Sequence, residues 1–363
     1  MTEAFGRPKK LETRAELLAL FQNPSQDFAA ISFFFWNGEA LTKERLSWQL
    51  EQLRSKGVGG TIVSYIHQAN LDIDNSDPVV FSAAWWELFV WFIGESKRLG
   101  MKVGIQDYCI VNPMLEQLAV DFPELRGAAL ENIQLEAVGA DAVKLEVPDG
   151  AALVSVRAFP RLEDRLDAEA SLDLQPLMRG RKLAWIAPDG QWTVVAVYAS
   201  PKGFNPLHPT AGARAIERLY TPFETHCADE LGQTLAVFFQ DELDFGNRMP
   251  RWSPEVLSEF KQRKGYDLGP ELAALWFNLG ARTSKIRIDY ADVVTQLTED
   301  HYFKPVYTWH ERHGTLFGHD NLGRGDIAEG LSAYGDAMRT MRWYSAPGSD
   351  DPHLEGKRRF MGF

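Results

Sequence analysis

The feature that most constrains the fold is a repeated alternation of short apolar segments with longer amphipathic ones. Residues 31–36 (ISFFFW), 60–66 (GTIVSYI) and 102–106 (KVGIQ) are predicted to be buried strands because they are short and largely apolar. Helical patterns between them begin at Thr42 and Ser82, whose side chains can cap a helix. Because no hairpin signal joins the strands, the alternation predicts parallel βαβ units.

A different pattern interrupts this alternation in the middle of the chain. Residues 129–199 contain alternating stretches such as 152–158 and 192–198, with turn signals between them. This pattern predicts an inserted antiparallel β subdomain, and one long ornamented loop is the alternative. The predicted organisation is therefore a first part over 1–128, the insertion, and a second part over 200–363.

The alternation resumes after the insertion and points to a barrel. Further strands are predicted at 235–240, 315–318 and 343–346, and Pro305 is expected to kink or restart the helical stretch over 284–313. Six βα repeats favour the α/β class and a (β/α)8-type TIM barrel, of which about six strands are present. We expect an incomplete barrel that ends before its seventh strand. The alternative is a doubly wound open sheet, which needs no further strands.

The segment LAVFFQDELD, residues 235–244, places two acids at the end of a buried strand. Burying an unpaired carboxylate inside a strand is unfavourable, whereas α/β enzymes place their chemistry at the carboxyl ends of parallel strands. Glycoside hydrolysis needs one carboxylic acid to protonate the departing oxygen and a second carboxylate to attack the sugar or activate water. We predict that Glu242 is the acid and that Asp241 holds its geometry or raises its pKa by like-charge repulsion. The alternative is that both acids merely cap the following loop.

Other polar and aromatic side chains follow the predicted strands and are expected to share one mouth. Acids, amides and aromatic rings together suit a neutral carbohydrate substrate, although each of these residues alone is more often structural. No glycine-rich phosphate loop or nucleophile-elbow motif is present. The candidates for substrate binding are Trp36, His67, Gln106, Asp107, Tyr108, His319, Asp320, Asn321 and Asp350.

Composition excludes several other classes of function. The formal net charge of −12 argues against nucleic acid or an anionic membrane as partner. Cys109 and Cys227 are the two cysteines, so neither a disulfide framework nor a zinc site is expected. The sequence shows no signal peptide, so a cytoplasmic location is the default, and a periplasmic or secreted one applies if the N-terminus has been trimmed. The sequence does not specify an oligomeric state.

Several segments resemble, in order, the catalytic barrel of glycoside hydrolase family 106, the α-L-rhamnosidases, and its uncharacterised relatives. The likeness covers nearly the whole chain and is interrupted by the β insertion. The matching segments are FFFWNGEALTKERLSWQLEQLRSKGVGG, ESKRLGMKVGIQDY, FNPLHPTAGARAIERLYTPF, VFFQDELDF, WSPEVLSEFKQRKGYDL, FKPVYTWHERHGTLFGH and MRWYSAPGSDDP.

The resemblance implies a (β/α)8 barrel and inverting hydrolysis of a terminal sugar, with no required cofactor and calcium in some members. Glu242 matches the acid that follows the fourth strand, but Leu243 stands where relatives usually have a proline. The partner carboxylate expected after the seventh strand has no counterpart in this sequence. The 363 residues alone are therefore expected to be poorly active or inactive.

Two other functions are compatible with the same strand-end residues. A metal-dependent sugar isomerase or epimerase would use Glu242, His319, Asp320 and Asp350 as oxygen and nitrogen ligands. A non-catalytic carbohydrate-binding protein would use the same surface without hydrolysis.

Overall fold

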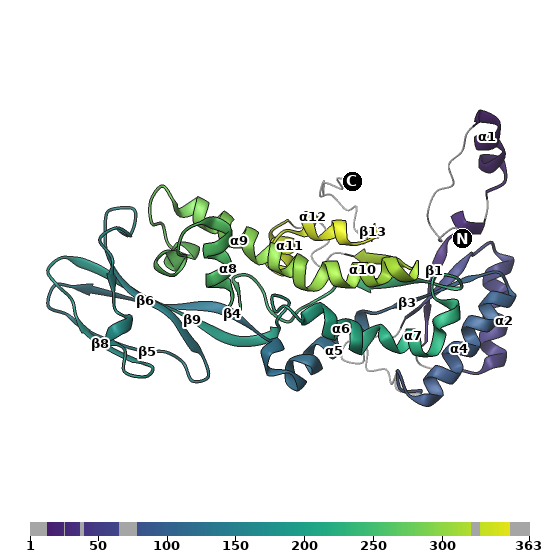
Figure 1. The fold of residues 1–363 in the computed structure, drawn as a ribbon, viewed down its shortest axis with the longest axis horizontal. Coiled ribbons are helices and arrows are strands. Elements are labelled where there is room, and N and C mark those ends of the chain that lie inside the picture. The colour runs from purple at the N-terminus through teal and green to yellow at the C-terminus, as the bar shows by residue number, and fades with distance from the viewer. Residues whose placement is uncertain (1–12, 25, 37–39, 65–77, 321–326, 349–363) are drawn as a thin grey trace.

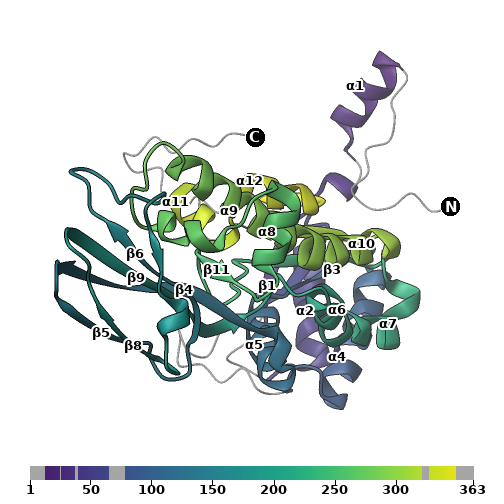
Figure 2. The ribbon, with the colours of Figure 1, turned by 60° about the vertical axis from the view of Figure 1, so that its left-hand side comes forward.

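A computed structural model describes residues 13–24, 26–36, 40–64, 78–320 and 327–348 of the chain. Figure 1 shows an elongated molecule in which the parallel strands lie at one end and the antiparallel strands at the other. Figure 2 shows the same two parts from a direction turned by 60°.

The first part is built on a six-stranded sheet in which all neighbouring strands are parallel. Its spatial order follows the order of the chain without reversal, whereas a doubly wound sheet reverses its order once. Within the described residues the first and last strands each pair with one neighbour, so this sheet is not closed into a barrel. The strands are β1 (Ile31–Phe35), β2 (Gly60–Ser64), β3 (Lys102–Gln106), β10 (Leu235–Asp241), β12 (Leu316–Asp320) and β13 (Ala346–Gly348).

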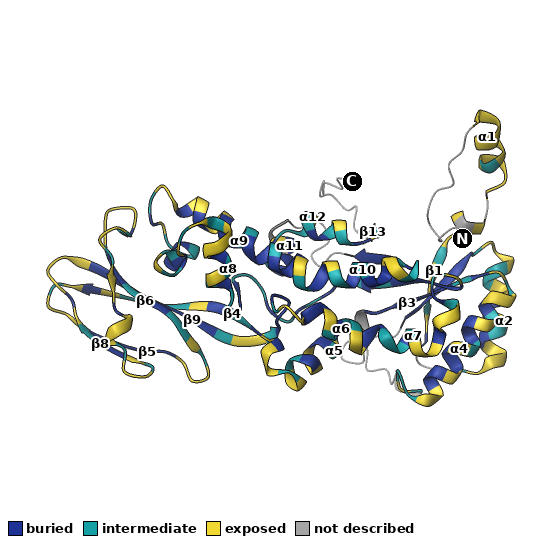
Figure 3. Cartoon of the chain, viewed as in Figure 1, coloured by how far each residue is buried: buried dark blue, intermediate teal, exposed yellow. Residues whose placement is uncertain are grey.

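Helices cover one face of this sheet, and an aromatic core lies between the two layers. Thr42 and Ser82 cap the first two of these helices, since their hydroxyls accept from the backbone N–H groups of Arg45 and Trp85. Figure 3 shows the resulting stripe of buried residues along each helix. No described helix is long and apolar enough to cross a membrane. The helices in this layer are α2 (Lys43–Ser55), α4 (Ala83–Arg98), α5 (Tyr108–Asp121), α6 (Ala211–Leu219), α7 (Thr221–Cys227) and α10 (Lys304–His313).

The opposite face of the sheet carries a smaller apolar cluster of Ile62, Ala236 and Val237. Toward the β1 edge this face is exposed, because 43% of the surface of Phe33 and 54% of that of Phe35 are accessible. We call the two sides the helix-covered face and the opposite face.

The second part is a pair of antiparallel sheets that the chain enters at Arg126 and leaves at Phe204. The larger sheet packs one face against the smaller sheet and the other face against helices from later in the chain. The larger sheet contains β4 (Arg126–Val138), β6 (Ala152–Pro160), β7 (Leu172–Asp173), β9 (Gln191–Phe204) and β11 (Arg251–Trp252), and the smaller one β5 (Ala142–Glu146) and β8 (Lys182–Ile186).

Helices and turns complete the chain. The α-helices are α1 (Arg14–Gln22), α8 (Val256–Lys264), α9 (Thr283–Thr298), α11 (Ile327–Tyr334) and α12 (Ala337–Thr340). The short 3-10 segments are η1 (Gln26–Phe28), η2 (Pro123–Leu125), η3 (Gln175–Leu177), η4 (Ala228–Glu230), η5 (Gly269–Leu275) and η7 (Met341–Trp343).

The long helical stretch expected to change at Pro305 does restart there. A π-helical turn, η6 (Glu299–Phe303), separates α9 from α10, and Pro305 lies in the first turn of α10. Proline has no N–H to donate, so the first turn of a new helix is where it fits. In this turn the buried Glu299 carboxylate accepts from Trp343 Nε1 at 3.0 Å and pairs with Arg342 at 2.8 Å. The turn therefore anchors the end of the described chain.

The boundary of the last strand differs from the sequence prediction. The last strand was expected at 343–346 but lies at Ala346–Gly348, and Trp343 belongs to a 3-10 turn. Gly335, at a φ of 87°, separates α11 from α12. A left-handed glycine ends a helix readily, and this explains the break.

The aromatic core generates a stability prediction. Phe92 is fully buried, and its ring centroid lies 5.1 Å from that of Trp36 and 5.7 Å from that of Phe34. We expect Phe92→Ala to lower the free energy of unfolding by about 3–5 kcal/mol in urea denaturation. The matched control is Trp48→Ala, because Trp48 is 60% exposed and its loss should change stability by less than about 0.5 kcal/mol. Equal effects of the two substitutions would contradict the packing described.

Candidate active site at the carboxyl ends of the parallel strands

Side chains at the strand ends divide between the two faces of the sheet. Successive residues of a strand point to opposite sides, and residues in register on neighbouring parallel strands point to the same side. Ser64 and Gln106 follow the parity of Ile62 and therefore lie on the opposite face, where Asp241 and Asp320 are in register with each other. This face thus brings together three of the predicted site residues, Gln106, Asp241 and Asp320.

A chain of hydrogen bonds joins three neighbouring strands on this face. The Ser64 hydroxyl donates to Gln106 Oε1, and Gln106 Nε2 donates to Asp241 Oδ2. An amide that donates to a carboxylate oxygen restricts the rotation of that side chain, so this relay fixes the orientation of Asp241. Asp241 is partly exposed, whereas Gln106 and Asp320 are buried.

Glu242 occupies a strained position directly after β10. Its φ of 44° lies in the left-handed region, which residues other than glycine adopt rarely. When they do adopt it, the residue is often at a functional site. Its backbone N–H donates to the Asp320 carbonyl at 3.1 Å, so the turn is held against β12. Leu243, where the family resemblance implies a proline, is fully buried, and its carbonyl accepts from Tyr334 Oη at 2.8 Å. Glu242 is therefore partly exposed at the carboxyl end of β10.

The loop that follows Glu242 contributes groups that the sequence analysis did not select. The Asp244 N–H donates to Asn112 Oδ1 at 3.1 Å, and Arg248 donates to both Asp244 oxygens at 2.7 and 3.0 Å. The i,i+4 spacing of Asp244 and Arg248 was a signal for this pair, but nothing local in the sequence indicated Asn112 or Ser64.

Trp36, Asp107 and His319 were expected at the same mouth, but the structure places them beneath the helices. All three are buried, because their parity on the strands is that of the helix-covered face. Tyr220 Oη donates to Asp107 Oδ2 at 3.2 Å, and Trp36 packs against the aromatic core. His319 stacks on Tyr344 with ring centroids 4.2 Å apart.

Burial shifts the pKa values of Asp107 and His319 so that both side chains favour their neutral forms. Loss of solvent, with a smaller contribution from the charge of Asp241, raises the pKa of Asp107 well above its usual range. Loss of solvent also lowers the pKa of His319 to about 4, although its Nδ1 lies 3.0 Å from the Gln240 carbonyl. These two residues are therefore poor candidates for direct contact with a substrate.

The remaining predicted residues lie outside the described part of the chain. These are His67, Asn321 and Asp350; Tyr108 begins α5, but its side chain is not described.

The described residues do not supply a metal site. No three acidic, histidine or cysteine side chains among them lie together as a metal would require. Calcium binds six to eight oxygens, and the described residues bring together no acidic cluster for the ion that the family resemblance implies. The ligand set of an isomerase is not assembled either, because His319 and Asp320 point to opposite faces.

Comparison with known proteins found similar folds but did not assign the chain to a family. No sequence family matches the chain, and no curated protein matches it either. A rhamnosidase from Novosphingobium sp. PP1Y is similar in structure, with a TM-score of 0.62 and 13% identity over 90% of this chain and 49% of that one. The chain thus spans about half the length of that rhamnosidase. A trehalulose synthase was also found, with a TM-score of 0.33 and 11% identity over 81% of this chain and 45% of that one.

The buried imidazole of His319 generates a prediction on pH. Its pKa is about 4 in the folded chain against 6.5 ordinarily, so the unfolded chain takes up the proton first as the pH falls. The folded state should therefore lose about 2 kcal/mol between pH 7 and pH 5 through this group. In urea denaturation, His319→Gln should show a correspondingly smaller loss over this interval.

The matched control is His226→Gln, which removes an exposed histidine. His310, whose pKa burial also lowers, is present in every protein compared. An unchanged pH dependence in His319→Gln would contradict the buried environment of His319.

Proposed function

We propose that this chain carries the acid-bearing part of a (β/α)8 glycoside hydrolase barrel, with α-L-rhamnosidase as the nearest named activity. The observation that carries the proposal is the arrangement at the end of β10. There the relay through Gln106 holds Asp241, and a left-handed turn holds Glu242 beside β12. Parallel strands that follow one another in chain order are the geometry of such barrels, and their carboxyl ends hold the active site. The structural likeness to a rhamnosidase supports the same fold.

In this proposal Glu242 is the general acid. It is partly exposed, and its backbone adopts the left-handed conformation directly after β10. Protonation of the departing oxygen lets the glycosidic bond break while positive charge develops on the sugar ring. Asp241 contributes a fixed negative charge beside that ring, which stabilises the transition state more than the neutral ground state.

Gln106 and Asp320 have positioning roles in the same proposal. Gln106 orients Asp241 through its amide, and the Asp320 carbonyl accepts from the Glu242 N–H. The partner carboxylate that would activate water is proposed to follow a seventh strand, as the resemblance to family 106 implies. Because the chain spans about half the length of the rhamnosidase, hydrolysis is proposed for the full-length protein.

The test of Glu242 uses aryl α-L-rhamnosides and the full-length protein. Glu242→Gln should lower kcat for a 4-nitrophenyl substrate roughly 10²–10⁴-fold, because the amide cannot protonate the leaving oxygen. The leaving oxygen of a 2,4-dinitrophenyl substrate needs little protonation, so kcat for that substrate should fall much less. The matched control is Glu217→Gln, a surface glutamate that pairs with Arg214 at 2.7 Å.

Three outcomes decide the proposal. An unchanged rate in Glu242→Gln, or an equal loss for both leaving groups, would remove Glu242 from the acid role. Sugar binding without hydrolysis by the unaltered full-length protein would favour a non-catalytic carbohydrate-binding function. A ketose product that disappears with chelator would favour the isomerase alternative.

A further inference from the structure

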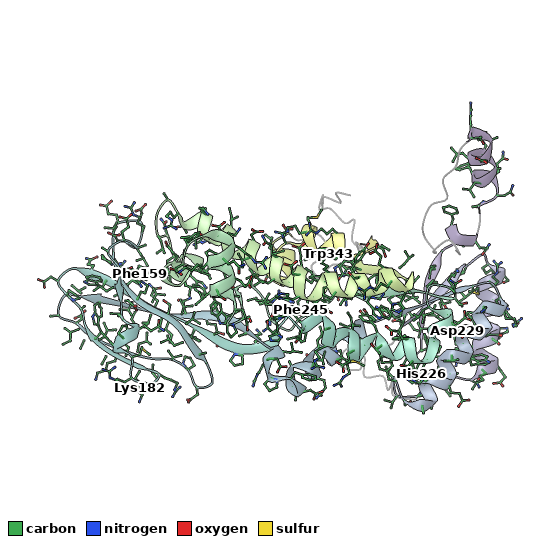
Figure 4. All side chains as sticks on the ribbon, in the orientation of Figure 1. Phe159, Lys182, His226, Asp229, Phe245 and Trp343 are labelled. Carbon is green, nitrogen blue, oxygen red and sulfur yellow. The ribbon has the colours of Figure 1, made fainter. Side chains whose placement is uncertain are left out.

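A second feature lies on the outer surface of the helices, away from the strand ends. Here α2, α4 and α7 line an open cavity of about 480 Å³ on the surface. Figure 4 labels His226, which contributes to it from α7. The opposite side of α4 packs Phe89 and Phe92 into the core, so the helix separates this cavity from the sheet. The cavity is therefore distinct from the proposed active site.

One stripe of α4 forms the floor of the cavity. Ala83, Trp86, Glu87, Val90 and Trp91 follow the i, i+3, i+4, i+7, i+8 spacing of a single helix face. An outward helix face is normally polar, but most of these residues are apolar or aromatic. A rigid helix thus presents aromatic rings to a concave part of the surface.

Packing fixes the orientation of the rings. Trp86 is stacked between the rings of Phe81 and His226. Its ring centroid lies 5.2 Å from that of Phe81, with 8° between the ring planes, and 4.3 Å from that of His226, with 12° between the planes. His226 is exposed and forms one aromatic wall of the cavity, while Trp91 is half-buried and forms another. Preorganised rings of this kind lose little conformational entropy when a flat ligand binds.

The polar groups of the cavity form one pair of opposite charge. Lys43 Nζ lies 3.4 Å from Glu87 Oε1 and 5.8 Å from the ring centroid of Trp91. Both charged side chains are well exposed, so they remain free to exchange water for a ligand. An ammonium donor beside a carboxylate acceptor matches two neighbouring hydroxyl groups. The pair adds no net charge, and the protein carries −12 in total, so a neutral ligand is favoured over an anion.

We propose that this cavity is a second carbohydrate-binding site that takes a neutral pyranose ring. The apolar C–H face of the sugar lies against Trp91 and His226, and two adjacent hydroxyls bridge Lys43 and Glu87. The volume falls within the range of small-ligand sites. This site goes beyond the proposed hydrolysis, because none of its residues takes part in the strand-end chemistry.

The test measures binding of two unreactive probes, methyl α-L-rhamnopyranoside and methyl α-D-glucopyranoside, by saturation-transfer NMR and calorimetry. We expect at least one probe to bind with a dissociation constant on the order of 1 mM or weaker, as suits a small ligand in an open cavity. Trp91→Ala should weaken this binding about 10-fold or more through loss of the ring. The matched control is Trp48→Ala, an exposed tryptophan of α2 that does not line the cavity.

A second pair of variants guards against misfolding of Trp91→Ala. Lys43→Ala and Glu87→Ala alter exposed side chains, so both proteins should fold, and each should weaken binding severalfold. Asp241→Asn addresses the strand-end site, and the binding assigned to the outer cavity should persist in that variant.

Several results would overturn the second site. One is unchanged affinity in Trp91→Ala together with unchanged affinity in Lys43→Ala and Glu87→Ala. Another is complete loss of binding in Asp241→Asn, which would assign all binding to the strand ends. A failure of both probes to bind would also reject the second site. None of these results bears on Glu242, whose role is judged by the leaving-group dependence of hydrolysis.

Discussion

The alternation of side chains at the ends of parallel strands determines what each polar residue can do. Gln240 and Asp241 are neighbours in β10, yet one lies beneath the helices and the other on the opposite face. The same division separates Asp107 from Gln106 and His319 from Asp320. Burial drives Asp107 and His319 toward their neutral forms. The partly exposed Asp241 instead receives a hydrogen bond from an amide, so one row of residues is packed in the core and the next carries the proposed site.

Hydrogen bonds from buried tyrosines reach the strand ends near the proposed site. Tyr344 Oη donates to Gln240 Oε1 at 2.6 Å, and Tyr220 Oη donates to Asp107 at 3.2 Å. Tyr334 reaches the Leu243 carbonyl, directly after the strained Glu242. These bonds run from strand ends to the surrounding layer and leave little freedom at the turn. A backbone in the left-handed region persists only where its surroundings hold it, and the bonds of Tyr334 to Leu243 and of the Glu242 N–H to Asp320 supply that restraint.

The sequence was sufficient to predict the order of strands and helices, because short apolar runs and capping residues such as Thr42 and Ser82 are local signals. It was insufficient to decide which strand-end residues share a face. That decision depends on strand parity to within one residue, and a shift of one residue exchanges the two faces. Trp36, Asp107 and His319 were therefore placed with Asp241 when they belong to the core. Ser64 was missed because its contact with Gln106 spans two strands far apart in sequence.

The antiparallel insertion restrains the loop that carries Glu242, although it lies far from that residue in sequence. The edge strand β11 follows this loop and pairs with β4 of the insertion. Asn247 in the loop donates to the carbonyls of Lys202 and Phe204 at 2.9 and 2.8 Å. The fully buried Arg251 donates to the Ala333 carbonyl at 2.7 Å. A buried guanidinium is stable only with such partners, so the loop is fixed between the insertion and α11. The insertion is thereby part of the framework that restrains the loop after Glu242.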